Sequence, residues 1–377
     1  MLNRNGGCHM AHLVKDRQEI KLIHGGDIYS AKEQLGIMEN PPVILDFSAN
    51  INPLGLPEGV KQAILKSIDQ YSVYPDPLCR EFISSLSNFE RVPSSWLLCG
   101  NGAADLIYRL VYAKKPKKAM VLAPTFAEYE EALNAAACQV MHYDLQAEND
   151  FQLDEKMIEV LSEDMDMLFL CNPNNPTGQM ISKDLIYRIL KRCNALGILL
   201  VVDECFLDFL EEPEKYSAKK YLEEFENLFI LKAFTKIYAM AGIRLGYCIS
   251  SDEKLLEKIM KAGQPWSVST VAQIAGIQAI KEVDYIQRTK ELIFEERKYL
   301  ISAFVNLGIQ VIPSAANYIL IRCPFPKEKP LHDMLFEKGI LIRNCDNYHG
   351  LTKGYYRICI NKHEDNMTLI EALKEIY

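Results

Sequence analysis

With 377 residues, the chain is too long for one compact core, and its length predicts one large domain and one smaller one. Its 42 lysines and arginines against 50 aspartates and glutamates leave a net charge of −8 at pH 7, which argues against a nucleic-acid partner. No apolar run reaches the ~18 residues of a membrane span, and the 11 cysteines show neither paired nor metal-ligand spacing; we therefore expect a cytoplasmic protein with reduced cysteines, no membrane association and no metal.

In chain order, residues 1–58 come first and are rich in turn formers, so they predict an arm with a few small elements. Short apolar runs then alternate with segments of helical periodicity. Strands buried on both faces are typical of a parallel sheet covered by helices, so the expected fold is α/β with a mostly parallel sheet. The expected strands are residues 118–124, 165–172, 197–204, 227–234 and 246–250, and the expected helices are residues 103–113, 128–137 and 183–196.

From about residue 290 the pattern changes to a long helix followed by mixed α and β elements. We expect this part and the N-terminal arm to form a small α+β domain together. Its expected strands are residues 309–312, 317–322, 339–343 and 355–360, with a helix at 331–338. The predicted division is residues 1–58 for the arm and part of the small domain, 59–289 for the large domain, and 290–377 for the C-terminal small domain.

Two motifs follow predicted strands as loops. Gly102 and Ala103 open a predicted helix, and the bare N–H groups of such a helix start form an anion site, although small residues are also common at ordinary strand–helix turns. Residues 172–178, NPNNPTG, come directly after the strand at 165–172. Asparagine, proline and glycine suit a tight turn, but a plain turn does not need all seven positions.

Charged side chains end two further predicted strands. Asp203 ends the run at 197–202, where a buried carboxylate is costly unless it has a cationic partner, such as a ring nitrogen that it keeps protonated. Lys236 ends the next strand, and Arg244 follows eight residues later. A partly desolvated lysine has a lowered pKa, so its neutral amine can form an imine, and the arginine can bind phosphate in fork geometry. Each lysine or arginine alone is typical of an ordinary surface charge. The four motifs together, in this order, are a much more specific signal.

In this order, the motifs from Gly100 to Tyr247 resemble the fold-type I pyridoxal-phosphate (PLP) enzymes, which have the aspartate-aminotransferase fold, and within them the histidinol-phosphate aminotransferase-like group. The resemblance implies that PLP forms a Schiff base with Lys236 and that Asp203 pairs with the pyridine nitrogen. It also implies roles for Asn175 at the phenolic oxygen, Tyr129 stacked on the ring, and Gly102, Ala103, Thr235 and Arg244 around the phosphate. Tyr74 would reach the phosphate in the neighbouring subunit, so the resemblance implies a homodimer.

Further details, over almost the whole chain from residue 24, resemble the threonine-phosphate decarboxylases of cobalamin biosynthesis. They are residues 24–26 (HGG), 46–55 (DFSANINPLG) and 264–268 (QPWSV), and Phe206, where most of these aminotransferases have a tyrosine that donates to the phenolic oxygen. By this resemblance the substrate is a phosphorylated amino acid. The implied substrate-binding residues are Arg357 at the carboxylate, Arg343, His24 and Asn50 at the phosphate, and also Gly25 and Asn175. The chain departs from the family at Ala233, which replaces a usual hydroxyl, and at Ser269, which replaces a usual asparagine.

The implied reaction is PLP-dependent decarboxylation of L-threonine O-3-phosphate to (R)-1-amino-2-propanol O-2-phosphate, with Lys236, Asp203 and Tyr129 as catalytic residues. Two other functions stay open. An aminotransferase acting on histidinol phosphate would use the same cofactor residues, and a non-catalytic PLP-fold binding protein is expected to lack Lys236 or to carry a DNA-binding domain, neither of which the sequence shows. Phosphoserine also stays open as a substrate, because one methyl group changes discrimination by only ~1–3 kcal/mol.

Overall fold

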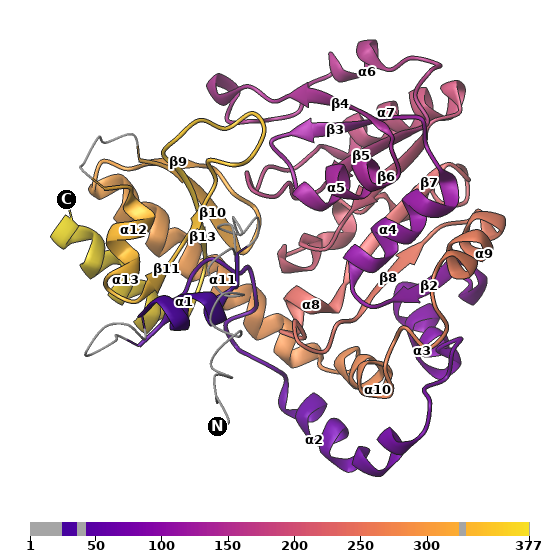
Figure 1. Cartoon of the computed structure of the whole chain (residues 1–377), viewed down its shortest axis with the longest axis horizontal. Helices are drawn as coiled ribbons and strands as arrows, with labels where there is room; N and C mark the ends of the chain where they lie inside the picture. The colour runs from indigo at the N-terminus through magenta and orange to yellow at the C-terminus, as the bar shows by residue number, and fades with distance from the viewer. Residues whose placement is uncertain (1–24, 36–42, 324–328, 377) are drawn as a thin grey trace, which may run out of the picture.

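The computed structural model describes residues 25–35, 43–323 and 329–376 (Figure 1). A seven-stranded sheet lies at the centre of the larger part of the molecule, in the strand order β2-β8-β7-β6-β5-β3-β4. β8 is antiparallel to both of its neighbours, β2 and β7, and the strands from β7 to β4 are parallel, which confirms the expected mostly parallel sheet. The strands are β2 (Leu97–Gly100), β3 (Lys118–Ala123), β4 (Gln139–Asp144), β5 (Met167–Cys171), β6 (Leu199–Asp203), β7 (Leu228–Ala233) and β8 (Gly246–Ile249).

Helices cover both faces of this sheet because its central strands are apolar on both faces. In β6, Leu200 and Val202 belong to the core beneath α7 (Lys183–Leu196), whereas Leu199 and Val201 belong to the core beneath α4 (Ala103–Lys114). The bounds of α7 match those expected because its ends carry clear signals: Ser182 Oγ accepts from the Leu185 backbone N–H at 3.2 Å, and a left-handed glycine follows the last residue. The other helices of this part are α2 (Glu58–Lys66), α3 (Arg80–Glu90), α5 (Ala127–Ala135), α6 (Met157–Val160), α8 (Phe234–Ile237), α9 (Glu253–Ala262) and α10 (Thr270–Ala279).

The second part of the molecule joins both ends of the chain. A four-stranded antiparallel sheet, β12-β13-β10-β9, lies next to a two-stranded parallel pair, β1-β11, in which Leu45 is opposite Ile340. The predicted division at residues 58 and 289 stays a prediction, and the long helix α11 runs across the second of these positions. The elements are α1 (Ile28–Leu35), β1 (Leu45–Asp46), α11 (Val283–Asn306), β9 (Gln310–Ile312), β10 (Tyr318–Arg322), α12 (Leu331–Phe336), β11 (Ile340–Leu341), β12 (Arg343–Asn344), β13 (Tyr355–Cys359) and α13 (His363–Ile376).

Two expectations about strands need correction. The strand expected at residues 339–343 is two short strands, β11 and β12, which belong to different sheets and are separated by Ile342. β4 was not expected at all, because this edge strand pairs only with β3 and its residues are exposed or half-buried, so it lacks a continuous apolar run. Among the described helices, none has the length and apolarity needed to cross a membrane.

Candidate active site

The parallel strands bring the predicted site residues to one edge of the sheet. β3, β5, β6 and β7 all end at this edge, where α/β folds place their ligands. A cleft of about 350 Å³ opens there, between the sheet and β13. The predicted residues that line it are Gly25, Asn50, Ala103, Tyr129, Asn175, Asp203, Thr235, Lys236, Arg244 and Arg357.

Four predicted residues do not line this cleft. Gly102 lies directly beside it, against Arg244. Arg343 lines a smaller adjoining cavity of about 60 Å³. Tyr74 is 78% exposed and stacks on Trp266 with 4.6 Å between ring centroids, away from the cleft of its own chain. His24 lies outside the described residues.

The start of α4 forms a cradle for an anion. Gly102 precedes the helix with φ of +83°, and a Cβ added there would lie 2.6 Å from Nη2 of Arg244, so only glycine leaves space for the guanidinium. Gly246 gives the same close approach, because its Cβ would lie 2.5 Å from the backbone N of Ala103. Helix N–H groups, a guanidinium and the hydroxyl of Thr235 together suit a phosphate group.

Asp203 is a buried carboxylate at the end of β6. Its Oδ1 accepts from the Cys205 backbone N–H at 2.9 Å, and its Oδ2 accepts from the Tyr129 hydroxyl at 2.6 Å. Burial raises the pKa of Asp203, and these hydrogen bonds oppose the increase only in part. A protonated ring nitrogen would stabilise this carboxylate in its charged form. The Tyr129 ring is fully buried and stacks on Phe169 at 4.9 Å.

Lys236 lies one short turn beyond β7, in α8. Burial, together with the nearby cations Arg357 and Arg244, lowers the pKa of its amine to about 8. A much larger fraction of this amine is therefore neutral near pH 7 than for a typical lysine, which has a pKa of about 10.4. A neutral amine is the nucleophile that imine formation requires.

Arg357 is buried at the side of the cleft that β13 forms. Its Nη1 donates to Oδ1 of Asn175, and its Nη2 donates to the Ser48 backbone carbonyl, both at 2.6 Å. Two buried polar atoms of the wall, Nε of Arg357 and Oδ1 of Asn50, have no hydrogen-bond partner among the described residues. Such atoms are costly in an empty site, and a polar ligand would satisfy them.

Arg343 and Arg357 are directly opposite each other on β12 and β13. Like charges in directly opposite positions of neighbouring strands are destabilising. Arg343 is held by its Nη1 bond to the Asn344 carbonyl at 2.6 Å and its Nη2 bond to Oδ1 of Asn347 at 2.9 Å. The two strands therefore concentrate positive charge beside the cleft, which favours a ligand with more than one negative charge.

These features fit PLP: a phosphate cradle at Gly102 and Arg244, a buried carboxylate for a ring nitrogen, and an amine with a lowered pKa. The sequence reasoning missed other residues that line the cleft. Cys171 and Cys205 lie within two positions of predicted motifs, so they were within reach of motif reasoning. Phe126 lies three residues before Tyr129 and was also within reach, whereas Tyr348 carried no sequence signal, because its place depends on how two distant segments approach each other.

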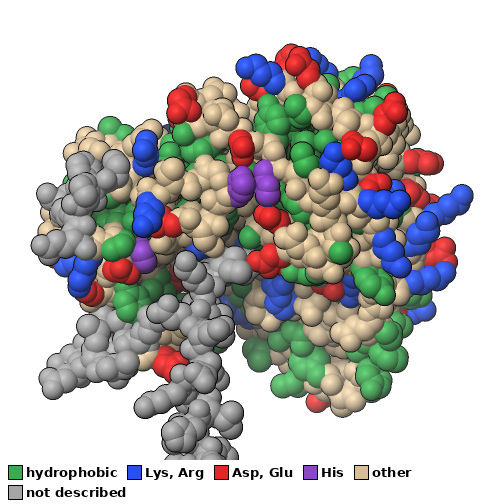
Figure 2. Space-filling model, turned by 45° about the horizontal axis from the view of Figure 1, so that its top comes forward, with side chains coloured by type: hydrophobic (Ala, Val, Ile, Leu, Met, Phe, Trp, Pro, Cys, Tyr) green, Lys and Arg blue, Asp and Glu red, His purple; other side chains and the backbone are tan. Residues whose placement is uncertain are grey.

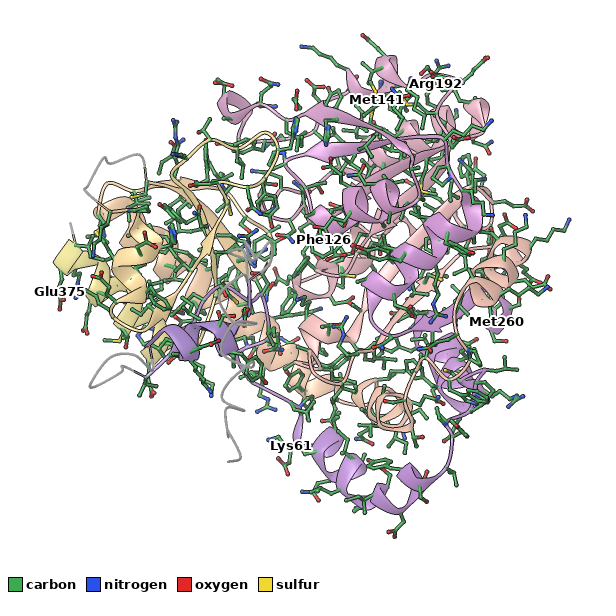
Figure 3. The ribbon with its side chains drawn as sticks, in the orientation of Figure 1. Lys61, Phe126, Met141, Arg192, Met260 and Glu375 are labelled. Atoms are coloured by element: carbon green, nitrogen blue, oxygen red, sulfur yellow. The ribbon has the colours of Figure 1, made fainter. Side chains whose placement is uncertain are left out.

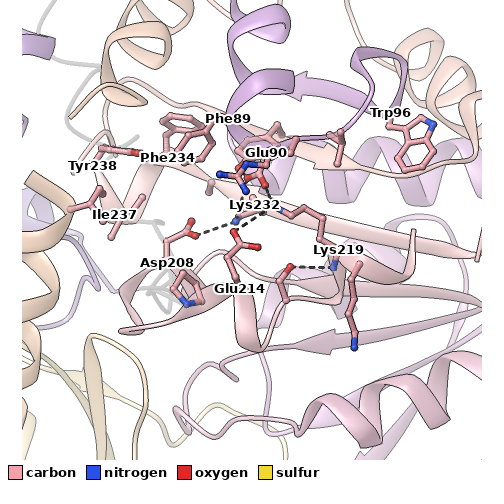
Figure 4. A pocket seen from close by; sticks show the side chains of 18 of the residues that line it. Phe89, Glu90, Trp96, Asp208, Glu214, Lys219, Lys232, Phe234, Ile237 and Tyr238 are labelled. Atoms are coloured by element: carbon pink, nitrogen blue, oxygen red, sulfur yellow. Dashed lines mark hydrogen bonds and ion pairs between the residues drawn. The ribbon is translucent and has the colours of Figure 1, made fainter. Parts of the chain in front are cut away.

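A larger cavity of about 730 Å³ lies on the other side of β7, and its buried charged groups Lys232 and Glu90 are paired with neighbouring charges (Figure 4). Nζ of Lys232 lies 3.1 Å from Oδ1 of Asp208 and 3.4 Å from Oε1 of Glu90, and Lys219 also binds Glu90, at 2.7 Å. Although burial opposes the change, Lys232 and Lys219 lower the pKa of Glu90 to about 2. Because Lys232 and Glu90 are satisfied by these ion pairs, they do not present the chemistry of the cleft.

Comparisons with known proteins agree with this geometry. The model of the family "Aminotransferase class I and II" matches residues 42–373. A threonine-phosphate decarboxylase of Salmonella typhimurium is 38% identical over 354 residues, which are 94% of this chain and 96% of that protein. A histidinol-phosphate aminotransferase of Caldicellulosiruptor saccharolyticus is 30% identical over 356 residues, 94% of this chain and 96% of that protein.

Among solved structures, the histidinol-phosphate aminotransferase from Clostridium acetobutylicum superimposes with a TM-score of 0.83 at 31% identity, covering 88% of this chain and 99% of that chain. The resemblance inferred from the motifs and the expected fold are thereby confirmed. The chain belongs to the aminotransferase class I and II family and is a PLP-dependent enzyme.

Proposed function

We propose that this enzyme decarboxylates L-threonine O-3-phosphate to (R)-1-amino-2-propanol O-2-phosphate for the side chain of cobalamin. The curated threonine-phosphate decarboxylase is more similar to the chain than the curated histidinol-phosphate aminotransferase, at 38% against 30% identity over nearly equal lengths. The charge of the site supports a substrate with more than one negative charge, because Arg357 lines the cleft and Arg343, in the adjoining cavity, adds its positive charge from the position directly opposite on the next strand.

One observation carries the choice of decarboxylation. Phe206 lines the cleft, and by the resemblance it stands where most of the related aminotransferases have a tyrosine that donates to the phenolic oxygen. Tyr318 packs edge-on against Phe206 at 5.0 Å, but its hydroxyl donates to the Asn174 backbone carbonyl at 2.9 Å and does not replace the missing one. The amide of Asn175 is then the donor to the phenolic oxygen, and its Oδ1 is already occupied by Arg357.

PLP, when bound, supplies the electron sink for the bond that breaks. Arg357 binds the substrate carboxylate, and its bonds to Asn175 and Ser48 fix the direction of the guanidinium. Asp203 keeps a proton on the ring nitrogen. Lys236 exists in both protonation states near pH 8, so its Nζ can deliver the proton that replaces the carboxylate at the α-carbon.

We also propose a homodimer in which Tyr74 reaches the phosphate site of the partner. Tyr74 belongs to an exposed apolar surface with Val73, Ile68 and Leu65, which are 62–67% exposed, and with Trp266 at 45%. Exposed apolar residues close together in sequence, with Tyr74 stacked on Trp266, support a protein–protein contact here. Tyr74→Phe should weaken cofactor retention while leaving the fold intact, and a fully active monomer in sedimentation would refute the dimer.

A cytoplasmic location is proposed from the cysteines. Every cysteine among the described residues is free and buried. Reduced thiols are typical of reducing compartments. A protein recovered only from an oxidising compartment would contradict this location.

The test of the reaction is product analysis with phosphothreonine, with and without 2-oxoglutarate. A decarboxylase returns PLP in each cycle, so we expect carbon dioxide and aminopropanol phosphate over many turnovers without a keto acid. An aminotransferase would stall after one turnover and recover only with 2-oxoglutarate, and that result would overturn the proposal.

A further inference from the structure

Two aromatic side chains separate the cleft from the adjoining small cavity. Among the residues that line them, Phe126 and Tyr348 are shared by both cavities. On one side of this pair lie Lys236, Asp203 and Arg357, and on the other side lies Arg343. We call Phe126 and Tyr348 the aromatic partition.

The two halves of the partition come from different parts of the fold. Phe126 directly precedes α5, near the middle of the molecule in Figure 3. Tyr348 belongs to the loop of residues 345–354, which joins β12 to β13. The guanidinium of Arg343 lies 5.2 Å from the centre of the Tyr348 ring, a cation–π contact that holds the ring in place.

The loop that carries Tyr348 is fastened to the large sheet by the two residues that follow it. The imidazole of His349 stacks on that of His142 in β4, with 4.0 Å between centroids and 4° between planes, and a pair of adjacent histidines is visible on the surface in Figure 2. Nε2 of His349 also lies 3.4 Å from Oδ1 of Asp144. At Gly350, φ is +81° and an added Cβ would lie 2.9 Å from the Ala123 backbone, so the loop contacts the end of β3 directly.

Because the cleft is small, the aromatic partition limits the length of the substrate side chain that it can hold. About 350 Å³ is at the small end of the roughly 300–1,000 Å³ typical of ligand sites, and here the cleft must hold the cofactor as well as the substrate. A longer substrate side chain has to pass Phe126 and Tyr348 and enter a cavity of only about 60 Å³. The side chain of phosphothreonine is short, whereas that of histidinol phosphate includes an imidazole ring.

We propose that the aromatic partition restricts this enzyme to phosphorylated amino acids with short side chains, and that the His142–His349 contact positions Tyr348 for this role. The inference rests on the proposed function for the choice of phosphothreonine as the preferred substrate. Tyr348 and Phe126 are specificity-determining residues in this view, and His349 is a positioning residue.

The experiment compares two ligands on the PLP-loaded enzyme. Dissociation constants for phosphothreonine and for L-histidinol phosphate are measured from the change in cofactor absorbance, and their ratio is the readout. Tyr348→Ala joins the two cavities, so we expect the preference for phosphothreonine to fall by at least about tenfold, the scale of a lost pocket contact. Phe126→Ala should act in the same direction, which guards against a fold defect in one variant.

Two control variants test whether the change in preference comes from the aromatic partition itself. Tyr348→Phe keeps the ring, so its ratio should stay within about threefold of the wild-type ratio; a change as large as that of Tyr348→Ala would overturn the proposal. His349→Ala should lower the preference by a few fold. His363→Ala is its matched control, because His363 also pairs with a carboxylate, Glu296 at 3.0 Å, but lies away from the cleft.

The outcomes also separate this inference from the proposed function. If the alanine variants leave the ratio unchanged while the wild-type enzyme decarboxylates phosphothreonine, the partition has no selective role and the function stands. If the ratio shifts as expected but the wild-type enzyme transaminates, the function fails and the partition stands. A His349→Ala ratio equal to that of His363→Ala would overturn the positioning role of the histidine contact.

Discussion

Lys232 and Lys236 lie four residues apart, one in the cavity behind β7 and the other in the cleft at its end, and their pKa values change in opposite directions. Burial lowers the pKa of both amines. Around Lys232, however, the carboxylates of Asp208, Glu90 and Glu204 outweigh burial, and its pKa is raised. Around Lys236 the cations Arg357 and Arg244 add to burial, and its pKa falls to about 8.

Two neighbouring carboxylates share one pKa direction and differ in access, because burial raises the pKa of both Asp203 and Glu204. Asp203 faces the cleft, whereas Glu204 faces the other side of β6, where it accepts from the Ser217 hydroxyl at 2.8 Å and the Ala218 backbone N–H at 2.7 Å. Burial is therefore not what distinguishes a reactive group from a structural one in this molecule. For the two lysines the distinction is the sign of the neighbouring charges, and for the two carboxylates it is access to a cleft that admits a ligand.

The largest expected effect is the loss of activity when Lys236 is removed. Lys236→Ala should lower turnover by at least about a thousandfold, because it removes the amine that we propose binds the cofactor and delivers the proton. Borohydride treatment of the wild-type enzyme should fix a pyridoxyl group on Lys236 alone, as mass spectrometry of peptides would show. Label on Lys232, or an active Lys236→Ala enzyme, would contradict the assignment.

Removal of the other lysine should affect stability instead. Lys232→Met leaves Glu90 and Asp208 without this partner, so we expect a loss of about 3–5 kcal/mol in the free energy of unfolding, measured in urea. The matched control is Lys261→Met, which breaks the exposed pair with Glu257 and should cost about 1 kcal/mol or less. Equal losses in the two variants would show that the buried ion pairs of Lys232 contribute no more to stability than the exposed pair of Lys261.

The pH dependence of stability sharpens the comparison further. The pKa of Glu90 is lowered from 4.5 to about 2 in the folded state, a difference worth about 3 kcal/mol. Because the folded-state pKa is the lower one, this stability is present above about pH 4.5 and is lost as the pH falls toward about 2. The advantage of wild type over Glu90→Gln should therefore shrink across that window; an advantage independent of pH would contradict the assignment.

The smallest expected effect concerns the Lys236 amine itself. In protein freed of cofactor, the rate at which an acylating reagent modifies Lys236 should rise with pH around a midpoint near 8. Arg357→Gln removes a neighbouring cation, so the midpoint should move upward, but burial remains and keeps it below that of an exposed lysine. Arg343→Gln is the control and should move the midpoint less, since Arg343 lies beyond the aromatic partition.

The parts of the fold that sequence predicted well are those where burial alone determines structure. The apolar runs of β5, β6 and β7 were found to within two residues at either end, because strands buried on both faces leave a continuous signal. β4 was missed because this edge strand lacks a continuous apolar run. Asp203 and Lys236 were found from their positions at strand ends, and the structure brings both to one cleft.

Other features of the site depend on contacts between distant segments, which a linear pattern does not record. The sequence separation of Arg343 and Arg357 gives no hint that they are opposite each other on neighbouring strands. Nor does it indicate that Tyr348 and Phe126 line the same cavities, since this requires the 345–354 loop to contact the end of β3. The roles of the individual site residues remain predictions that the experiments above address.

The pairing of β1 with β11 has a consequence for how the chain is made. The last strand of the seven-stranded sheet ends at residue 249. That sheet can therefore form while the rest of the chain is still being synthesised. Leu45, in contrast, has to wait for Ile340 before its strand is paired. β1 is therefore paired only after residue 340 has been synthesised. A nascent protein cut short before residue 340 would carry an unpaired strand edge, which is a site of aggregation.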